Sequence, residues 1–206
     1  MSAARVLVLY YSSTGAVAEL ARYVARGAEG AGAQAIVRTV PSLRTTVESP
    51  GAATGPAFAQ PDDLRSCDAI VLGSPTRFGN MAAPLKHFLE QTSDIWLSGG
   101  LVDKPAGVFT SSSSAHGGQE STLLTMVLPL VHHGMIWVGV PYTVGELFST
   151  SSGGGPYGAS HVAPESTRTR SAPALSAAEL TIARALGERV AGFAIRLHHS
   201  AAVPAR

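Results

Sequence analysis

Three short apolar runs in this chain are each followed at once by a loop rich in Ser, Thr and Gly. The first run, residues 6–11, shows no alternation of apolar and polar side chains, which is typical of a strand buried on both faces of a parallel sheet. In a doubly wound α/β sheet the loops after such strands converge at one edge, where ligands bind. We therefore expect residues 12–15, 74–80 and 111–118 to form one composite pocket.

Apolar periodicity predicts strands that alternate with helices along the whole chain. The final helix has the clearest start, because Ser176 and Glu179 have capping-box spacing and Leu175 and Leu180 have that of a hydrophobic staple. With right-handed crossovers, the element order predicts a five-stranded parallel sheet in the order 2-1-3-4-5. The predicted strands are residues 6–11, 34–40, 68–73, 106–110 and 135–140, and the predicted helices are residues 15–32, 81–92, 120–133 with a kink at Pro129, and a last helix that runs to about residue 197.

The length of 206 residues fits one such domain with enlarged loops, residues 1–206. Two segments, at about residues 42–61 and 143–173, show no helical or strand period and are too long to be simple connections. We expect them to be insertions that complete a site or an interface.

Composition and charge argue against two classes of partner. Because the formal net charge is +1, with no basic stripe and no basic amphipathic helix, we expect no nucleic acid and no membrane partner. The longest apolar stretch, residues 126–140, is interrupted by Pro129, His132 and His133 and is too short to span a bilayer. The single Cys67 and the absence of a signal-peptide pattern favour a reducing compartment, and we expect a cytoplasmic protein.

The loop after the first strand has the composition of a phosphate site. Hydroxyl donors and a glycine precede a helix whose N–H groups and dipole favour an anion, although the same residues also occur in an ordinary helix N-cap. The P-loop and dinucleotide fingerprints are absent, and the second strand does not end in an acidic residue that would hold an NAD ribose. A mononucleotide is therefore favoured over a dinucleotide as the resident cofactor.

Several short sequence motifs of this chain resemble those of one family. The chain closely resembles the WrbA family, the flavodoxin-like, FMN-dependent NAD(P)H:quinone oxidoreductases of type IV, and this resemblance implies a flavodoxin-like three-layer sandwich. The strings that carry it are Val8-Leu9-Tyr10-Tyr11-Ser12, Asp68-Ala69-Ile70, Gly73-Ser74-Pro75-Thr76-Arg77-Phe78-Gly79-Asn80-Met81, Gly117-Gly118-Gln119-Glu120, His132-His133-Gly134-Met135, Glu146-Leu147-Phe148 and Pro156-Tyr157-Gly158-Ala159.

The resemblance implies a role for each of the three loops. The first loop would hold the FMN phosphate, the second would border the isoalloxazine ring, and the third would wrap its other edge. His132 would lie near the ring, and Trp96 matches the aromatic substrate position of the family. The implied cofactor-binding residues are Ser12, Ser13, Thr14, Gly15, Ala16, Val17, Pro75, Thr76, Arg77, Phe78, Gly79, Ser111, Ser112, Ser113, Ser114, Ala115, His116, Gly117 and His132.

The remaining polar candidates have alternative interpretations. His132 is the candidate catalytic residue, either as a donor to the ring or to a quinone oxygen, but it could equally be structural. Adjacent histidines on a helix do not face the same way, and no second ligand cluster accompanies His132 and His133, so we expect no metal. Cys67 has no basic neighbour and is predicted to be an inert, packed thiol.

The predicted function is the two-electron reduction of quinones by NAD(P)H through a ping-pong mechanism. The alternative is a flavodoxin-type electron carrier without enzymatic activity, but carriers of that kind use a strongly charged docking face, whereas this chain is almost neutral. Members of the family form homotetramers in which neighbouring subunits help wall each flavin site, and we expect a homotetramer here.

Overall fold

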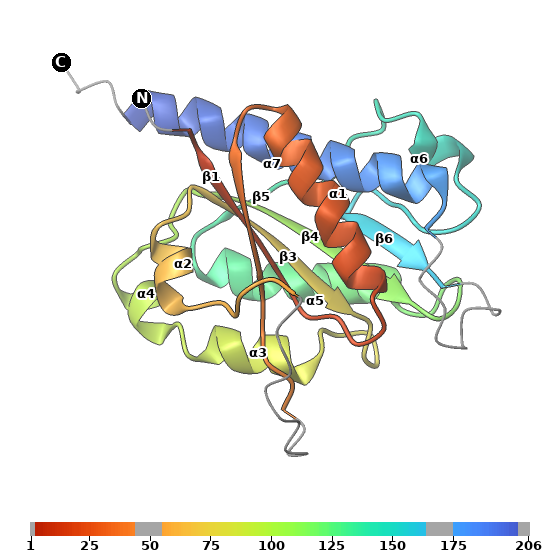
Figure 1. The fold of residues 1–206 in the computed structure, drawn as a ribbon, viewed down its shortest axis with the longest axis horizontal. Coiled ribbons are helices and arrows are strands. Elements are labelled where there is room, and N and C mark those ends of the chain that lie inside the picture. The colour runs from red at the N-terminus through yellow and green to blue at the C-terminus, as the bar shows by residue number, and fades with distance from the viewer. Residues whose placement is uncertain (1–2, 44–54, 164–174, 202–206) are drawn as a thin grey trace.

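The computed structural model describes residues 3–43, 55–163 and 175–201 of the 206-residue chain. It alternates strands and helices around a central sheet, as the sequence predicts (Figure 1). In chain order the elements are β1 (Arg5–Tyr10), α1 (Ala16–Gly30), β2 (Gln34–Thr39), α2 (Pro61–Arg65), β3 (Ala69–Pro75), α3 (Ala83–Glu90), α4 (Ser93–Leu97), β4 (Pro105–Ser112), α5 (Gln119–His132), β5 (Ile136–Trp137), α6 (Glu146–Ser149), β6 (Ala159–Val162) and α7 (Ala177–Ala201).

The sheet confirms the predicted order. Its strands run β2-β1-β3-β4-β5, and every pair is parallel. Helices α1 and α7 cover one face, and α3, α4 and α5 cover the other (Figure 1). This arrangement brings the carboxyl ends of β1, β3 and β4 to one edge, where the three Ser- and Thr-rich loops begin.

Alternate residues of the central strands supply two hydrophobic cores. On β1, Val6 and Val8 pack towards α1 and α7, whereas Leu7 and Leu9 pack towards α3 and α5. All four side chains are fully buried. A strand with helices on both faces has no polar face, and this explains the unbroken apolar run from which β1 is predicted.

The predicted fifth strand, residues 135–140, is split in the structure. Only Ile136–Trp137 is a regular strand, and it pairs with the first residues of β4. The second half of the same β4 edge is paired by β6, with Phe109 opposite Ala159 and Ser112 opposite Val162. Residues 141–158 therefore interrupt one sheet edge, and β6, which the sequence reading missed, continues it.

Other boundaries differ by a few residues. The predicted helix 81–92 is α3, which begins at Ala83, and the separate short helix α4 follows it. The end of the segment 42–61 adds a bridge between Thr39 and Phe58 and the first residue of α2, whereas residues 44–54 of this segment lie outside the described residues. The segment 143–173 contributes α6 and β6, and its residues 164–173 also lie outside them. None of the helices in the described residues is long and apolar enough to cross a membrane.

The first turn of α7 confirms the predicted capping box. The N–H of Glu179 donates to Ser176 Oγ over 3.2 Å, and the N–H of Ser176 donates to Glu179 Oε2 over 2.8 Å. Glu179 is almost fully buried. Burial alone would raise the pKa of this carboxyl group, but hydrogen bonds from His161 and from the N–H groups of Ser176 and Val162 lower it to about 2.

We expect Glu179 to make the free energy of unfolding depend on pH in the acidic range. A carboxyl group whose pKa is lowered on folding stabilises the protein above its unfolded pKa, and the stabilisation is lost as the pH falls through the folded pKa. The pKa of Glu179 falls from its ordinary value of 4.5 to about 2 on folding, and protonation of the group in acid therefore removes about 3 kcal/mol of stability. Replacing Glu179 by Gln should therefore destabilise the protein most at pH values above 4.5 and progressively less towards pH 2. Urea unfolding of both proteins across this range measures the effect, and a difference independent of pH would contradict it.

Candidate functional site

The loops after β1, β3 and β4 line one cleft of about 450 Å³ at the carboxyl edge of the sheet. Small-molecule sites usually measure about 300 to 1,000 Å³, so this cleft is large enough for a mononucleotide. Ala163, directly after β6, adds a wall that the sequence reading did not include. The lining residues are Ser13, Thr14, Ala16, Val17, Pro75, Thr76, Arg77, Phe78, Ser111, Ser112, Ser113, Gly117 and Ala163.

The first loop presents an uncapped helix N-terminus to the cleft. Gly15 occupies the N-cap position with a φ of 97°, and no side chain caps the first turn of α1. Ser12 closes the loop, because its Oγ accepts a hydrogen bond of 3.1 Å from the N–H of Gly15. The hydroxyl groups of Ser13 and Thr14 therefore do not serve as an N-cap, and the N–H groups of this turn remain available to an anion.

The second loop brings a cation to this turn. Arg77 Nη2 donates to Ser13 Oγ over 2.9 Å, and Nη1 donates to the carbonyl of Thr76 over the same distance. The first loop itself contains neither Lys nor Arg, and the family resemblance had implied that Arg77 borders the isoalloxazine ring rather than the phosphate. A contact between residues 64 positions apart has no local sequence signal. Guanidinium groups favour phosphate oxygens, and Arg77 adds charge complementarity for a phosphate.

A tight turn exposes an aromatic ring at the rim of the cleft. The main chains of Arg77 and Asn80 exchange two hydrogen bonds, of 2.8 and 3.0 Å. Between them Phe78 has a φ of 51°, Gly79 has a φ of 75°, and the Phe78 side chain is fully exposed. A positive φ at a bulky residue is uncommon and costs energy. The arrangement is typical of a side chain held out for a ligand or a partner.

The third loop is anchored by β4, which runs two residues past the predicted end at Thr110. The carbonyl of Ser111 accepts from the N–H of Thr76, and the carbonyl of Ser112 accepts from the N–H of Ala163, both over 2.9 Å. The cleft floor is therefore a continuation of the sheet rather than a free loop. Six further residues that were predicted to bind the cofactor do not line the cleft, namely Ser12, Gly15, Gly79, Ser114, Ala115 and His116.

His132 and Trp96 lie elsewhere in the same chain. They line a second cavity of about 350 Å³ between α3, α4 and the end of α5, and this cavity shares no lining residue with the cleft. Gly117 of the cleft lies just before the start of α5, and His132 is the last residue of this helix. The 14 residues of α5 span about 20 Å. Within one chain, His132 is therefore not a neighbour of the cleft.

His133, to which the sequence analysis gave no role, is the histidine with a defined partner in the second cavity. Its Nε2 lies 3.0 Å from Thr92 Oγ1, and that hydroxyl group donates to the carbonyl of Leu89. The hydroxyl oxygen must then accept a hydrogen bond from the N–H at Nε2. Burial and the neighbouring His132 both lower the pKa of His133. His133 is thus a structural, neutral histidine.

The remaining candidates of the sequence analysis are a metal site and the thiol of Cys67. In the described ranges there is no group of three or more His, Cys, Asp or Glu side chains that could hold a metal ion. Cys67 is buried and its Sγ donates to the carbonyl of Leu64. Burial raises the pKa of this thiol to about 12, which keeps it protonated and unreactive, in agreement with the prediction of a packed thiol.

Comparisons with known proteins agree on one family. Residues 4–147 match the family described as NADPH-dependent FMN reductase. The chain is 41% identical to an NAD(P)H dehydrogenase (quinone) of Rhizobium rhizogenes, over 94% of this chain and 98% of the relative. It is 44% identical to NAD(P)H dehydrogenase (quinone) 3 of Rhizobium meliloti, over 91% and 90% of the two chains.

The solved structures with the same fold include two that differ in their sequence identity to this chain. A WrbA-like flavodoxin from Agrobacterium tumefaciens superposes with a TM-score of 0.66 at 28% identity and covers 95% of this chain and 99% of its own. A flavodoxin from the domain Archaea superposes with a TM-score of 0.62, over 92% of this chain and 98% of its own, but its 16% identity supports the fold alone.

Proposed function

The chain belongs to the NADPH-dependent FMN reductase family, and on this basis we propose that it is an FMN-dependent NAD(P)H:quinone oxidoreductase. The observation that carries the proposal is the cleft at the carboxyl edge of the sheet, where an uncapped helix N-terminus, hydroxyl groups and Arg77 meet. These groups fit a phosphate, and the rest of the cleft offers apolar and hydroxyl surfaces for a ribityl chain and a flavin ring.

The residues of the cleft have distinct roles in this proposal. The first turn of α1, with Ser13, Thr14 and Arg77, holds the phosphate of FMN. Thr76 and Phe78 border the ring on one side, and Ser111 to Ser113 with Gly117 border it on the other. When bound, FMN supplies the transfer of two electrons from NAD(P)H to a quinone. The protein orients the ring, leaves one face of it open and surrounds it with dipoles.

Steady-state kinetics test this function. Since both substrates would use the same open face of the ring, the oxidised nucleotide must leave before the quinone binds. We expect one FMN per chain and parallel double-reciprocal plots of NAD(P)H oxidation at several quinone concentrations. Intersecting lines would indicate a ternary complex and contradict the shared face. An electron carrier would instead show almost no NAD(P)H oxidation until a partner reductase is added.

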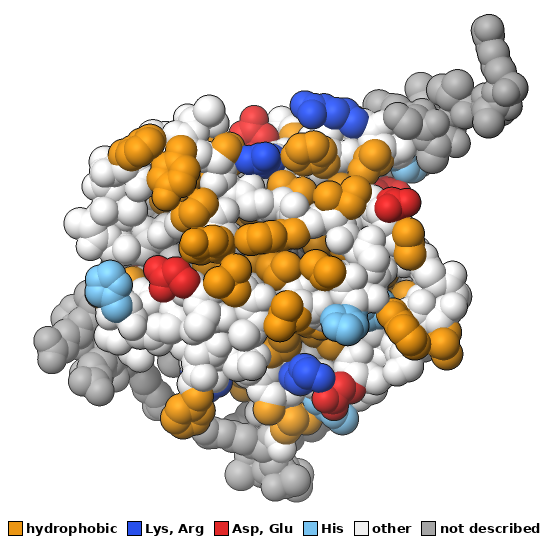
Figure 2. All heavy atoms as spheres, turned by 180° about the vertical axis from the view of Figure 1, so that it is seen from behind, with side chains coloured by type: hydrophobic (Ala, Val, Ile, Leu, Met, Phe, Trp, Pro, Cys, Tyr) orange, Lys and Arg blue, Asp and Glu red, His pale blue; other side chains and the backbone are white. Residues whose placement is uncertain are grey.

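We also propose that the chain assembles into a homotetramer. Helix α5 buries Leu123, Met126 and Leu130, yet its opposite side exposes Leu124, Leu128 and Val131. A helix that is apolar on both sides is normally buried on both. The molecular face in Figure 2 carries a band of hydrophobic side chains across its centre, and exposed Ile136 and Trp137 of β5 extend the apolar surface. A second copy of this chain is the proposed occupant of the face.

Assembly would give His132 and Trp96 a place in the reaction. They are remote from the cleft of their own chain, so a neighbouring subunit would have to bring them to a flavin site. Trp96 is half-exposed and available for such a contact. His132 would then face the ring or the quinone from the neighbouring subunit. Light scattering of the FMN-bound protein should report about four subunits per particle.

Replacing Trp96 by Ala tests this arrangement. A stacking wall contributes binding that the ground state and the transition state share, so its loss should raise the KM for the quinone more than it lowers kcat. We expect KM to rise about fivefold, the size of a typical aromatic contact. Trp96→Phe, which keeps a ring, is the matched control and should stay close to the parent protein. A monomer with full activity would show that each cleft is complete within one chain.

A further inference from the structure

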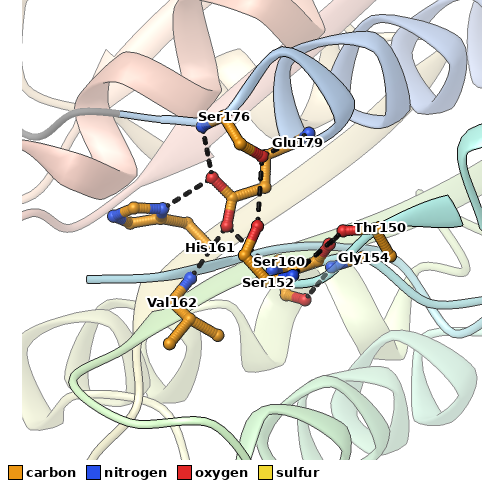
Figure 3. A network of polar contacts seen from close by, with 9 residues as sticks. Thr150, Ser152, Gly154, Ser160, His161, Val162, Ser176 and Glu179 are labelled. Atoms are coloured by element: carbon orange, nitrogen blue, oxygen red, sulfur yellow. Dashed lines mark hydrogen bonds and ion pairs between the residues drawn. The ribbon is translucent and has the colours of Figure 1, made fainter. Parts of the chain in front are cut away.

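A buried carboxylate ties the start of α7 to the strand beside the cleft (Figure 3). Glu179 and His161 have side chains that are each only 1% exposed. Glu179 Oε1 accepts hydrogen bonds from the N–H groups of Gly153 and Val162, over 2.9 and 3.0 Å. Oε2 accepts from the N–H of Ser176 and lies 2.9 Å from His161 Nδ1. We name Glu179 with these four partners the Glu179 clasp.

The clasp defines the protonation of its histidine. Each carboxylate oxygen is an acceptor only, and the low pKa of Glu179 keeps the group ionised. His161 Nδ1 must therefore carry a hydrogen and donate a hydrogen bond to Oε2. His161 Nε2 is buried and has no hydrogen-bond partner within the described ranges. Burying the unpaired Nε2 is unfavourable, and an apolar side chain at this position would avoid that cost. The hydrogen bond from Nδ1 to Glu179 is therefore the interaction that a histidine provides here.

Two residues of β6, His161 and Val162, form hydrogen bonds with Glu179, and both pair with strand β4 beside the cleft. His161 lies opposite Ser111 in the strand register, and Val162 lies opposite Ser112. Both serines line the cleft, and Ala163, the next residue of the chain, lines it as well. Ala163 in turn donates its N–H to the carbonyl of Ser112. A displacement of β6 would consequently move one whole wall of the cleft.

The main chain around Gly153, on the other side of Glu179, is closely packed. A Cβ at Gly153 would lie 2.1 Å from the carbonyl oxygen of Ser160 and 2.7 Å from Glu179 Oε1, so the main chain packs directly against both. Ser160 Oγ accepts from the N–H of Gly154, and Thr150 Oγ1 donates to the carbonyl of Gly153 (Figure 3). Residues 150–154 are therefore held in place by these contacts. The hydrogen bond from His161 to Glu179 then fixes β6 relative to them.

We propose that His161 is a positioning residue of the flavin site, which acts through Glu179 and β6 to hold Ser111, Ser112 and Ala163 at the wall of the cleft. The inference rests on the proposed binding of FMN in this cleft. It does not give His161 any contact with the flavin. The bond from Nδ1 to Glu179 is the feature on which the wall depends.

Two substitutions separate this role from simple packing. The amide nitrogen of Asn overlays Nδ1 of a histidine, whereas that of Gln overlays Nε2. His161→Asn thus keeps the bond to Glu179 and His161→Gln loses it. Ser176→Ala is the control, because it removes the Oγ bonds to the N–H of Glu179 and to Ser152 without touching β6. All three variants leave the main-chain donors of Glu179 in place.

The measurements are the FMN dissociation constant of the apoprotein, from quenching of flavin fluorescence, the visible circular dichroism of the bound flavin, and the Tm of the apoprotein. We expect His161→Gln to weaken FMN about tenfold and to change the flavin dichroism, because small displacements of a supporting shell degrade a site. His161→Asn should stay within about threefold of the parent protein. Ser176→Ala should lower the Tm but leave FMN affinity unchanged.

Three results would overturn the inference. They are an FMN affinity of His161→Gln equal to that of the parent, an equal loss in His161→Asn, or affinity losses that merely follow the Tm across all three variants. If His161→Gln does not fold, His161→Leu, which also lacks the Nδ1 donor, is compared with His161→Asn in the same way. A parent protein that binds no FMN at all would instead refute the proposed function, so the two failures are distinguishable.

Discussion

Replacing Gly15 by Val is expected to weaken FMN binding about hundredfold, which corresponds to about 3 kcal/mol. Two causes act together. The φ of 97° at Gly15 is strained for a β-branched residue, and the added side chain would stand where the main chain must approach the phosphate closely. Because this residue precedes α1 rather than packing inside a core, the chain should still fold.

The matched control is Gly30→Ala at the other end of α1. A Cβ at Gly30 would meet no other atom within 4 Å, so this variant should keep the FMN affinity of the parent. Titration of each apoprotein with limiting FMN measures the difference. If Gly15→Val retained a full complement of flavin, the first loop would not be the phosphate site.

Replacing Gly187 by Ala should lower the free energy of unfolding by about 3 kcal/mol. Helices α1 and α7 cross at glycines. A Cβ at Gly187 would lie 1.9 Å from the carbonyl oxygen of Val24, and one at Gly27 would lie 2.0 Å from that of Arg184. Since both obstacles are main-chain atoms, only a shift of a whole helix can relieve the overlap.

Gly192 on the same helix provides the control. A Cβ there would meet nothing within 4 Å, and Gly→Ala in an open helical position stabilises a protein by about 0.5 to 1 kcal/mol. Urea unfolding of the two apoprotein variants should therefore give changes of opposite sign. Equal effects would mean that α1 and α7 do not approach as closely as the structure shows.

The sequence predicts those parts of the molecule that repeat a local pattern. The apolar run of β1 has no polar face because helices cover both sides of the sheet, and Ser176 and Glu179 have a spacing that belongs to a capping box. The convergence of the three loops could be predicted because the carboxyl ends of parallel strands share one edge.

The remainder depends on contacts between distant residues. Strand β6 is only four residues long and exists because β4 offers it an open edge, which no local period announces. The bond from Arg77 to Ser13 likewise joins separate loops. The cap formed by Glu179 is predictable, but its bonds to His161 and Gly153 are not, because those residues arrive from another part of the chain.

The most direct test of the proposed function is an anaerobic titration followed by the visible absorbance of the flavin. The protein reconstituted with FMN is mixed with NADH or NADPH, and benzoquinone is then added, with no other protein present. An NAD(P)H:quinone oxidoreductase should lose its flavin absorbance with one equivalent of nucleotide and regain it fully with one equivalent of quinone. A flavin that stays oxidised with both nucleotides, and is reduced only when a separate reductase is supplied, would contradict this function.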